Sequence, residues 1–176
     1  MEEILSTLIN GLSLGGIYAI IALGYTMVYG IAKMLNFAHG DVIMVGAYTV
    51  VLMFATSPAK GVAFALVLCV LVGIIVEKAA YRPLRGASPL AVLITAIGVS
   101  KLLQSSAQIF IGSEPKGLTL NLGEIKIGSL KISVLTLITI LLSIAVMVGL
   151  TLFVKYTKTG RAMIAVSEDK GAAQLM

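Results

Sequence analysis

The chain has 176 residues, of which 59% are hydrophobic and only 12% are charged, and its mean hydropathy is +1.05. Soluble domains are typically about 45–50% apolar and about 25% charged, so these charges are too few to cover a water-exposed surface. The apolar composition excludes a water-soluble enzyme and a disordered chain, and the single cysteine excludes a disulfide scaffold. The net charge is +5, but the sequence contains no run of Lys and Arg, which indicates no nucleic-acid partner.

Charge-free stretches divide the chain into apolar segments. No charged residue lies between Glu3 and Lys33 or between Lys131 and Lys155. An uncharged apolar run of about 18 residues or more is typical of a helix that crosses a membrane. We therefore predict an all-α polytopic membrane protein, with a single transmembrane domain over 1–176 and about five transmembrane helices, at 4–31, 42–56, 62–76, 90–111 and 134–154.

The first predicted span is rich in glycine, and we assign its glycines to helix packing. Gly11 and Gly15 are four residues apart, which places two small residues on one helix face and lets another helix approach closely. Gly16 and Gly24 are likewise assigned to helix packing. The alternative is a break in the helix beside a pathway through the membrane.

A short polar segment, 34–41, follows this span. Asp41 stands directly before an apolar run, so we expect it to be the N-cap of the second helix, with contact to a pore or gate as the alternative. Asn36 and His39 are candidates for the lining of a pathway. A histidine at the boundary of a span is, however, more often a satisfied interfacial residue than a proton relay.

Polar residues gather on one face of the fourth span. The residues at the helical spacing i, i+3, i+4 and i+7 are Lys101, Gln104, Ser105 and Gln108. A lysine near the middle of a bilayer costs about 2.5–3.5 kcal/mol, so this face should not contact lipid. The face either forms a buried polar seam between helices or lines a translocation path, and its residues are our candidates for such a path. Snorkelling of Lys101 to an interface is the third alternative.

The segment 112–133 is polar and is expected to lie outside the bilayer. Within it, Leu118–Leu122 and Ile125–Ile127 alternate apolar and polar residues around Gly123 and Glu124. This pattern predicts a small β-hairpin with Gly123 first in the turn.

The segment 155–176 is a polar tail in which we expect two short helices. Thr159 is the expected cap of the first helix, and Glu168 and Asp169 suit the first turn of the second. Eight basic residues fall in the connection after the first span, in the loop after the third span and in this tail. Four lie in the segments on the opposite side of the membrane. The positive-inside rule therefore places the tail in the cytoplasm, and the N-terminus and 112–133 outside it.

Motifs of catalysis and of nucleotide binding are absent from the sequence. It contains neither a GxxxxGK[ST] phosphate loop nor a GxGxxG motif, and its single histidine excludes a His-rich zinc site. We therefore expect no enzymatic activity, no metal and no cofactor in this chain. Any energy source must then lie on another subunit.

Several motifs occur in the order that is characteristic of one family. They are Asn10–Ala19, Ala22–Gly30, Asn36–Asp41, Arg82–Arg85 and Gly160–Met163 followed by Glu168–Asp169. Through these motifs, which are distributed along the whole chain, the sequence resembles the permeases of branched-chain amino acid ABC importers. It resembles the smaller of the two paralogous types of permease. The resemblance implies a multi-pass protein of a bacterial or archaeal cytoplasmic (inner) membrane.

The resemblance also implies the partners and the coupling site. Permeases of this kind move branched-chain amino acids by alternating access, together with a second paralogous permease, a periplasmic substrate-binding protein and cytoplasmic ABC ATPase subunits that use ATP. The tail matches the coupling loop that docks on the ATPase. Its implied contact residues are Gly160, Arg161, Ala165, Glu168, Asp169 and Ala172.

The chain departs from the family pattern at three positions and in length. Ile164 replaces a residue that is often basic, Ser105 replaces a frequent asparagine, and Lys101 replaces a usually apolar residue. The family continues beyond Met176 with further spans, so we expect this chain to be an incomplete permease domain that does not transport alone. Alternative functions are an importer permease for urea, short amides or other amino acids, a passive channel, and a structural membrane subunit.

Overall fold

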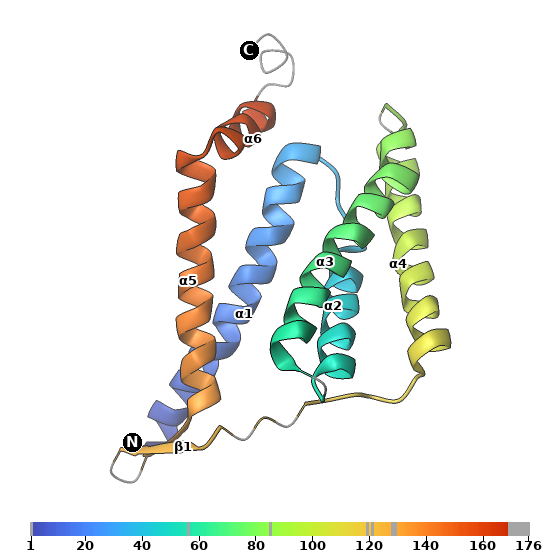
Figure 1. Cartoon of the computed structure of the whole chain (residues 1–176). Coiled ribbons are helices and arrows are strands. Elements are labelled where there is room, and N and C mark those ends of the chain that lie inside the picture. The colour runs from blue at the N-terminus through green and yellow to red at the C-terminus, as the bar shows by residue number, and fades with distance from the viewer. Residues whose placement is uncertain are drawn as a thin grey trace. The chain divides into compact units, whose positions relative to one another are not determined.

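The computed structural model describes residues 2–55, 57–84, 86–118, 120, 122–127 and 130–168. The chain divides into two compact units, one formed by Met1–Lys33 with Thr119–Met176 and the other by Met34–Leu118. Figure 1 shows the helices of both units. The predicted fold class is confirmed: the chain is an all-α polytopic membrane protein with one small antiparallel hairpin.

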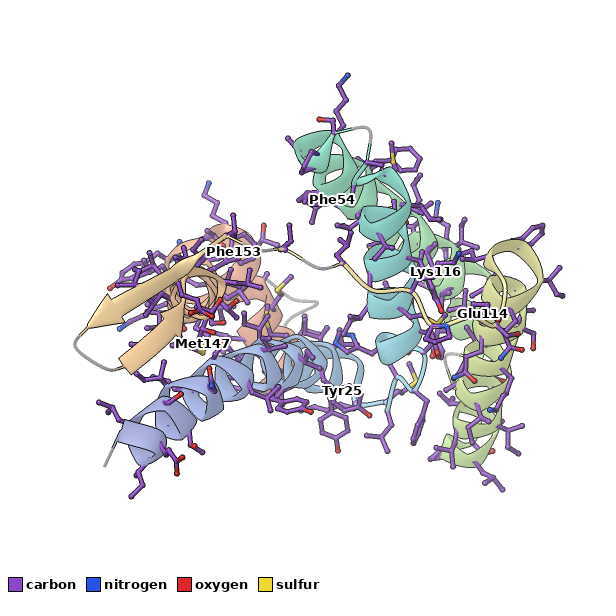
Figure 2. The ribbon with its side chains drawn as sticks, turned by 90° about the horizontal axis from the view of Figure 1, so that it is seen from below. Tyr25, Phe54, Glu114, Lys116, Met147 and Phe153 are labelled. Carbon is purple, nitrogen blue, oxygen red and sulfur yellow. The ribbon has the colours of Figure 1, made fainter. Side chains whose placement is uncertain are left out.

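The first unit is built on two long apolar helices, α1 (Glu2–Ala32) and α5 (Val134–Tyr156), which pack side by side (Figure 1). Gly16 marks a close approach between them. A Cβ added there would lie 2.9 Å from Cβ of Ser143, whose side chain is buried. Seen from below, Tyr25 lies on the side of α1 away from α5 (Figure 2). The two helices therefore meet through small residues, as expected for helices packed in a membrane.

The hairpin of this unit is displaced from its predicted position. Its strands are β1 (Glu124–Ile127) and β2 (Leu130–Ser133), with Ile125 paired to Ile132. The predicted first strand, Leu118–Leu122, is wrong, because its described residues form no strand and Gly123 has φ +87° just before β1. Gly123 therefore precedes the hairpin instead of forming its turn.

The second unit contains α2 (His39–Met53), α3 (Pro58–Val76) and α4 (Pro89–Ile111). Each of α3 and α4 begins with a proline directly after a serine N-cap, and Ser88 Oγ accepts a hydrogen bond from the backbone N–H of Ala91. Proline suits the first helical position because the N–H that it lacks would have no helical partner. These starts place α3 four residues before the predicted 62 and α4 one residue before the predicted 90.

Four helices of the described chain are long and apolar enough to cross a membrane, and α2 is shorter. They are Glu3–Ile31, Pro58–Leu84, Pro89–Ile111 and Val134–Tyr156. The 15 residues of α2 span about 22 Å, less than the hydrocarbon thickness of about 30 Å. The segment predicted as a full second span, 42–56, thus forms a short helix that packs along α3, where a Cβ at Gly46 would lie 2.8 Å from Cys69 Sγ.

A π-helical turn, η1 (Glu77–Tyr81), and a 3-10 turn, η2 (Arg82–Leu84), continue α3 at its end. They place Tyr81 in a buried cluster with Val92 and Ala96 of α4. Most large apolar side chains elsewhere are exposed, and Phe110 of α4 is 86% exposed. Lipid or further protein must cover these surfaces, as the membrane location of the chain requires.

Candidate functional site

Asp41 lies in the first turn of α2 with its side chain only 7% exposed. The prediction that it is the N-cap is wrong, since α2 begins at His39 and Ala38 occupies the cap position. Asn36 stabilises the chain before the helix instead, by accepting the backbone N–H of Ala38 at 3.1 Å. The carboxylate of Asp41 is thereby left to face α4, where its Oδ1 accepts a hydrogen bond from Nε2 of Gln104 at 2.9 Å.

Gln104 connects the polar groups of α2 and α4. Its Nε2 donates to Asp41 and also to Ser100 Oγ at 3.2 Å, and its Oε1 accepts from Lys101 Nζ at 3.2 Å. The amide is thus oriented with its N–H groups toward the carboxylate and its carbonyl toward the ammonium. We name these four residues, Asp41, Ser100, Lys101 and Gln104, the α2–α4 polar cluster.

The cluster lies at a depth in the membrane where a charged side chain raises the free energy of the protein. Lys101 is at the middle of α4, whose 23 residues span about 34 Å. Ionisable residues at such a depth are rare in membrane proteins and mark functional sites or specific partners. Within the described residues, no ion pair joins Asp41 to Lys101, so the Gln104 amide separates two opposite charges that it bonds on either side.

The predicted pathway residues are only partly brought together. Lys101 and Gln104 share the cluster, whereas Ser105 and Gln108 lie exposed on the same face of α4, further along the helix. Asn36 belongs to a second contact, in which its Oδ1 accepts the hydroxyl of Tyr81 at 2.7 Å. His39 is half-buried in the first turn of α2.

Three residues of these contacts are not among the site residues that the sequence predicts. Asp41 is predicted first as a cap, and Ser100 and Tyr81 have no predicted role. For Ser100 a signal exists, because it lies four residues before Gln104 and therefore on the same helix face. For Tyr81 the position depends on the π-helical turn, a feature often found at functional sites but without a sequence signal in this chain.

An apolar groove of about 340 Å³ runs between α2, α3 and α4. We name it the three-helix groove. Its walls include Val45, Leu52, Phe64, Leu68, Leu103 and Phe110. Val45 lies one turn after Asp41, and Leu103 is next to Gln104, so the groove begins beside the polar cluster.

A sharp corner joins α5 to α6 (Lys158–Glu168) in the first unit (Figure 1). Thr157 forms the corner: its Oγ1 donates to the carbonyl of Phe153 at 2.6 Å and accepts the N–H of Gly160 at 2.9 Å. The prediction that Thr159 caps this helix is therefore wrong, because the helix begins two residues earlier than that cap requires. Gly160 is buried, and a Cβ there would collide with the backbone of Val154.

The helix α6 packs across α1 and α5 and presents a charged outer face. Met163 and Ile164 line a small cavity of about 120 Å³ together with residues of α1 and α5. Arg161 and Glu168 are exposed, and Ala165 is half-buried. Asp169 and Ala172, also implied as coupling residues, lie outside the described residues, as does the predicted second tail helix.

The glycines assigned to packing differ in their surroundings. Gly16 lies in close contact with Ser143 of α5. A Cβ at Gly11 or Gly15 would have no described atom within 4 Å. Gly24 is half-buried within α1. Close helix packing is therefore shown at Gly16 and not at Gly11 or Gly15.

Comparison with known proteins places these features in a family. The model of the family described as branched-chain amino acid transport system / permease component matches residues 7–176. The high-affinity branched-chain amino acid transport system permease protein BraD of Pseudomonas aeruginosa is 38% identical over 98% of this chain and 62% of its own length. The corresponding protein LivH is 38% identical in Escherichia coli K12 and 36% identical in Salmonella typhimurium, over 98% of this chain and 61% of each relative.

No solved structure matches the chain significantly. The chain spans about three fifths of the length of the curated relatives that it matches. The family match nevertheless includes both the polar face of α4 and the helix α6, because it runs from residue 7 to residue 176. The resemblance inferred from the motifs is confirmed: the chain belongs to the family of permease components of branched-chain amino acid transport systems.

Proposed function

We propose that this chain forms part of the permease of an ATP-driven importer that moves branched-chain amino acids across the cytoplasmic membrane. The observation that carries the proposal is the family match over residues 7–176, together with relatives named as high-affinity branched-chain amino acid permeases. The membrane-length helices and the intramembrane polar cluster agree with it. The chain then contributes the path, and the energy comes from elsewhere.

The energy source is a pair of cytoplasmic ABC ATPase subunits, a partner that membership of this permease family supports. The outer face of α6 is the surface offered to them, with Arg161 and Glu168 as exposed charges and Asp169 and Ala172 following in the sequence. A second permease completes the path, and a periplasmic binding protein delivers the amino acid.

The α5–α6 corner transmits the movement of the ATPases. Thr157 bonds both helices, and the close packing of Gly160 on the backbone of Val154 leaves little freedom for α6 to pivot by itself. A push on α6 is therefore passed to α5. Such rigid-body movement of helices around a fixed site is the usual basis of alternating access.

The polar face of α4 lines the path, with Lys101, Gln104, Ser105 and Gln108 toward its water. Lys101, Ser105 and Gln108 are exposed, and polar groups at this depth face an aqueous cavity or protein rather than lipid. His39 begins α2 and Asn36 lies three residues before it, close in sequence to Asp41, which contacts α4.

The test is uptake by the full-length permease with its ATPases, second permease and binding protein in proteoliposomes. We expect uptake of radiolabelled leucine, isoleucine and valine that requires ATP and stops when the phosphate-binding lysine of the ATPases is replaced. Flux without ATP would instead show a passive channel. Uptake of urea or short amides in preference to leucine would contradict the proposed substrate class.

A further inference from the structure

We propose that Asp41 and Lys101 form a binding site for the ammonium and carboxylate groups of a zwitterionic α-amino acid, whose apolar side chain enters the three-helix groove. The inference rests on the proposed function and assigns its substrate site to named residues. It is carried by the polar cluster, by the exposure of Lys101 beside the buried Asp41 and by the position of the groove.

The Gln104 amide occupies the place that such a substrate would take. Its N–H end bonds the Asp41 carboxylate at 2.9 Å, as an ammonium would, and its carbonyl end bonds the Lys101 ammonium at 3.2 Å, as a carboxylate would. An α-amino acid carries both charged groups on one carbon, so its ammonium nitrogen and the nearer carboxylate oxygen are only slightly further apart than the nitrogen and oxygen of an amide. The cluster is therefore complementary to a zwitterion in both charge and spacing.

Replacement of the amide by the substrate is favourable for each charge. Hydrogen bonds between two ionised groups are shorter and stronger than those between an ion and a neutral amide. Asp41 is buried and Lys101 is exposed, so the ammonium end is enclosed whereas the carboxylate end is open. Rotation of the half-buried Gln104 side chain admits the substrate from the Lys101 side.

The groove supplies the apolar half of the site. It begins beside Asp41 and Gln104, and its volume of about 340 Å³ falls within the range of ligand pockets, which are lined mostly by apolar side chains around a few polar groups. Leu103 lies nearest the cluster in sequence, and Phe64 and Phe110 extend the wall. An aliphatic side chain fits this lining, whereas a charged or strongly polar one would lose its hydration there.

The test is equilibrium binding of radiolabelled L-leucine to the full-length permease complex in nanodiscs, without the binding protein. The competitors are isoamylamine, which lacks the carboxylate, and 4-methylpentanoate, which lacks the ammonium. We expect each to compete at least about tenfold more weakly than leucine, because each leaves one charge of the cluster unmatched. Competition by either analogue that is as strong as competition by unlabelled leucine would overturn the proposal.

The Asp41→Asn and Lys101→Met variants read the two halves of the site separately. Asp41→Asn should weaken leucine binding and reduce the advantage of leucine over 4-methylpentanoate, whereas Lys101→Met should reduce its advantage over isoamylamine. The matched controls are Glu114→Gln and Lys60→Met, which alter exposed charges outside the cluster and should bind as the unmodified complex does. A general loss of affinity without these selective changes would show a purely structural role and overturn the proposal.

A groove variant keeps the proposal testable if the charge variants assemble poorly. Ala107→Leu adds volume to the groove wall and should weaken binding of leucine more than binding of alanine, whereas Ala63→Leu, on an exposed position of α3 outside the groove, should not. Equal effects of the two variants would contradict the assignment. ATP-driven uptake by the unmodified importer is measured in parallel: its absence would refute the proposed function, whereas normal uptake by all variants would refute this site alone.

Discussion

Gly16 shows how one missing side chain sets the distance between two helices. A Cβ at this position would lie 2.9 Å from both Cβ and Oγ of Ser143, so any larger residue forces α5 to move or Ser143 to shift. Gly15, its neighbour in sequence, has no described atom within 4 Å of the corresponding position. Substitutions at Gly16 and at Gly15 can therefore be compared. The difference between them gives the free energy lost through the α1–α5 contact, apart from the effect of replacing a glycine within a helix.

We predict that Gly16→Val destabilises the α1–α5 contact by about 1–3 kcal/mol, as overpacking of a tight contact does. Gly15→Val is the matched control, and its effect should be within about 0.5 kcal/mol of zero, as for most surface changes. Thermal unfolding of both variants of the full-length permease in detergent measures the difference. Equal melting temperatures would show that Ser143 accommodates the larger residue.

The α5–α6 corner shows how local bonding gives a short helix a fixed direction. The hydroxyl of Thr157 caps α6, and Gly160 allows the backbone of α6 to contact the backbone of α5. Backbone atoms cannot rotate away as a flexible side chain can. The corner is for this reason more sensitive to substitution than the charged outer face of α6.

We predict that Gly160→Ala uncouples ATP hydrolysis from uptake, because the added Cβ meets the backbone of Val154 and must tilt α6 away from its docking direction. Gly149→Ala, on α5 with no described atom within 4 Å, is the matched control and should transport normally. The measurement is the ratio of leucine taken up to ATP hydrolysed in proteoliposomes. A normal ratio in Gly160→Ala would show that the corner does not transmit movement.

The orientation of the whole chain in the membrane depends on the distribution of basic residues. The positive-inside rule places 155–176 in the cytoplasm and 112–133 on the opposite side. The proposed function requires the first of these placements, since α6 must reach the ATPases. Lys116 and Glu114 lie in the segment after α4, and Lys158 begins α6 (Figure 2 labels the first two).

Single cysteines in a Cys69→Ala background test this orientation. We predict that a membrane-impermeant maleimide labels Lys116→Cys in intact cells, and labels Lys158→Cys only after the cells are permeabilised. Both positions are exposed in the structure, so access depends on the side of the membrane. Labelling of Lys158→Cys in intact cells would exclude contact between α6 and a cytoplasmic ATPase.

Apolar length and charge spacing alone are enough to specify a polytopic helical membrane protein. The reason is that the free energy of transferring about 20 apolar residues into lipid depends on those residues alone. Residues elsewhere in the chain do not change its sign. The motifs likewise identify the family, because each is a short run of residues that can be recognised without knowing its neighbours in space. Helical spacing alone places Lys101 and Gln104 on one face of α4, where they are hydrogen-bonded.

Other features depend on which faces meet in space. Asp41 stands directly before an apolar run, as an N-cap does, yet it bonds Gln104, 63 residues away, and Tyr81 bonds Asn36, 45 residues away. The predicted hairpin is present, but its strands are displaced, because the segments on both sides of Gly123 alternate equally well and only pairing selects the second. A polar group satisfies its hydrogen bonds with whatever packing brings near it, so its partner, and with it the geometry of the site, emerges only in the folded chain.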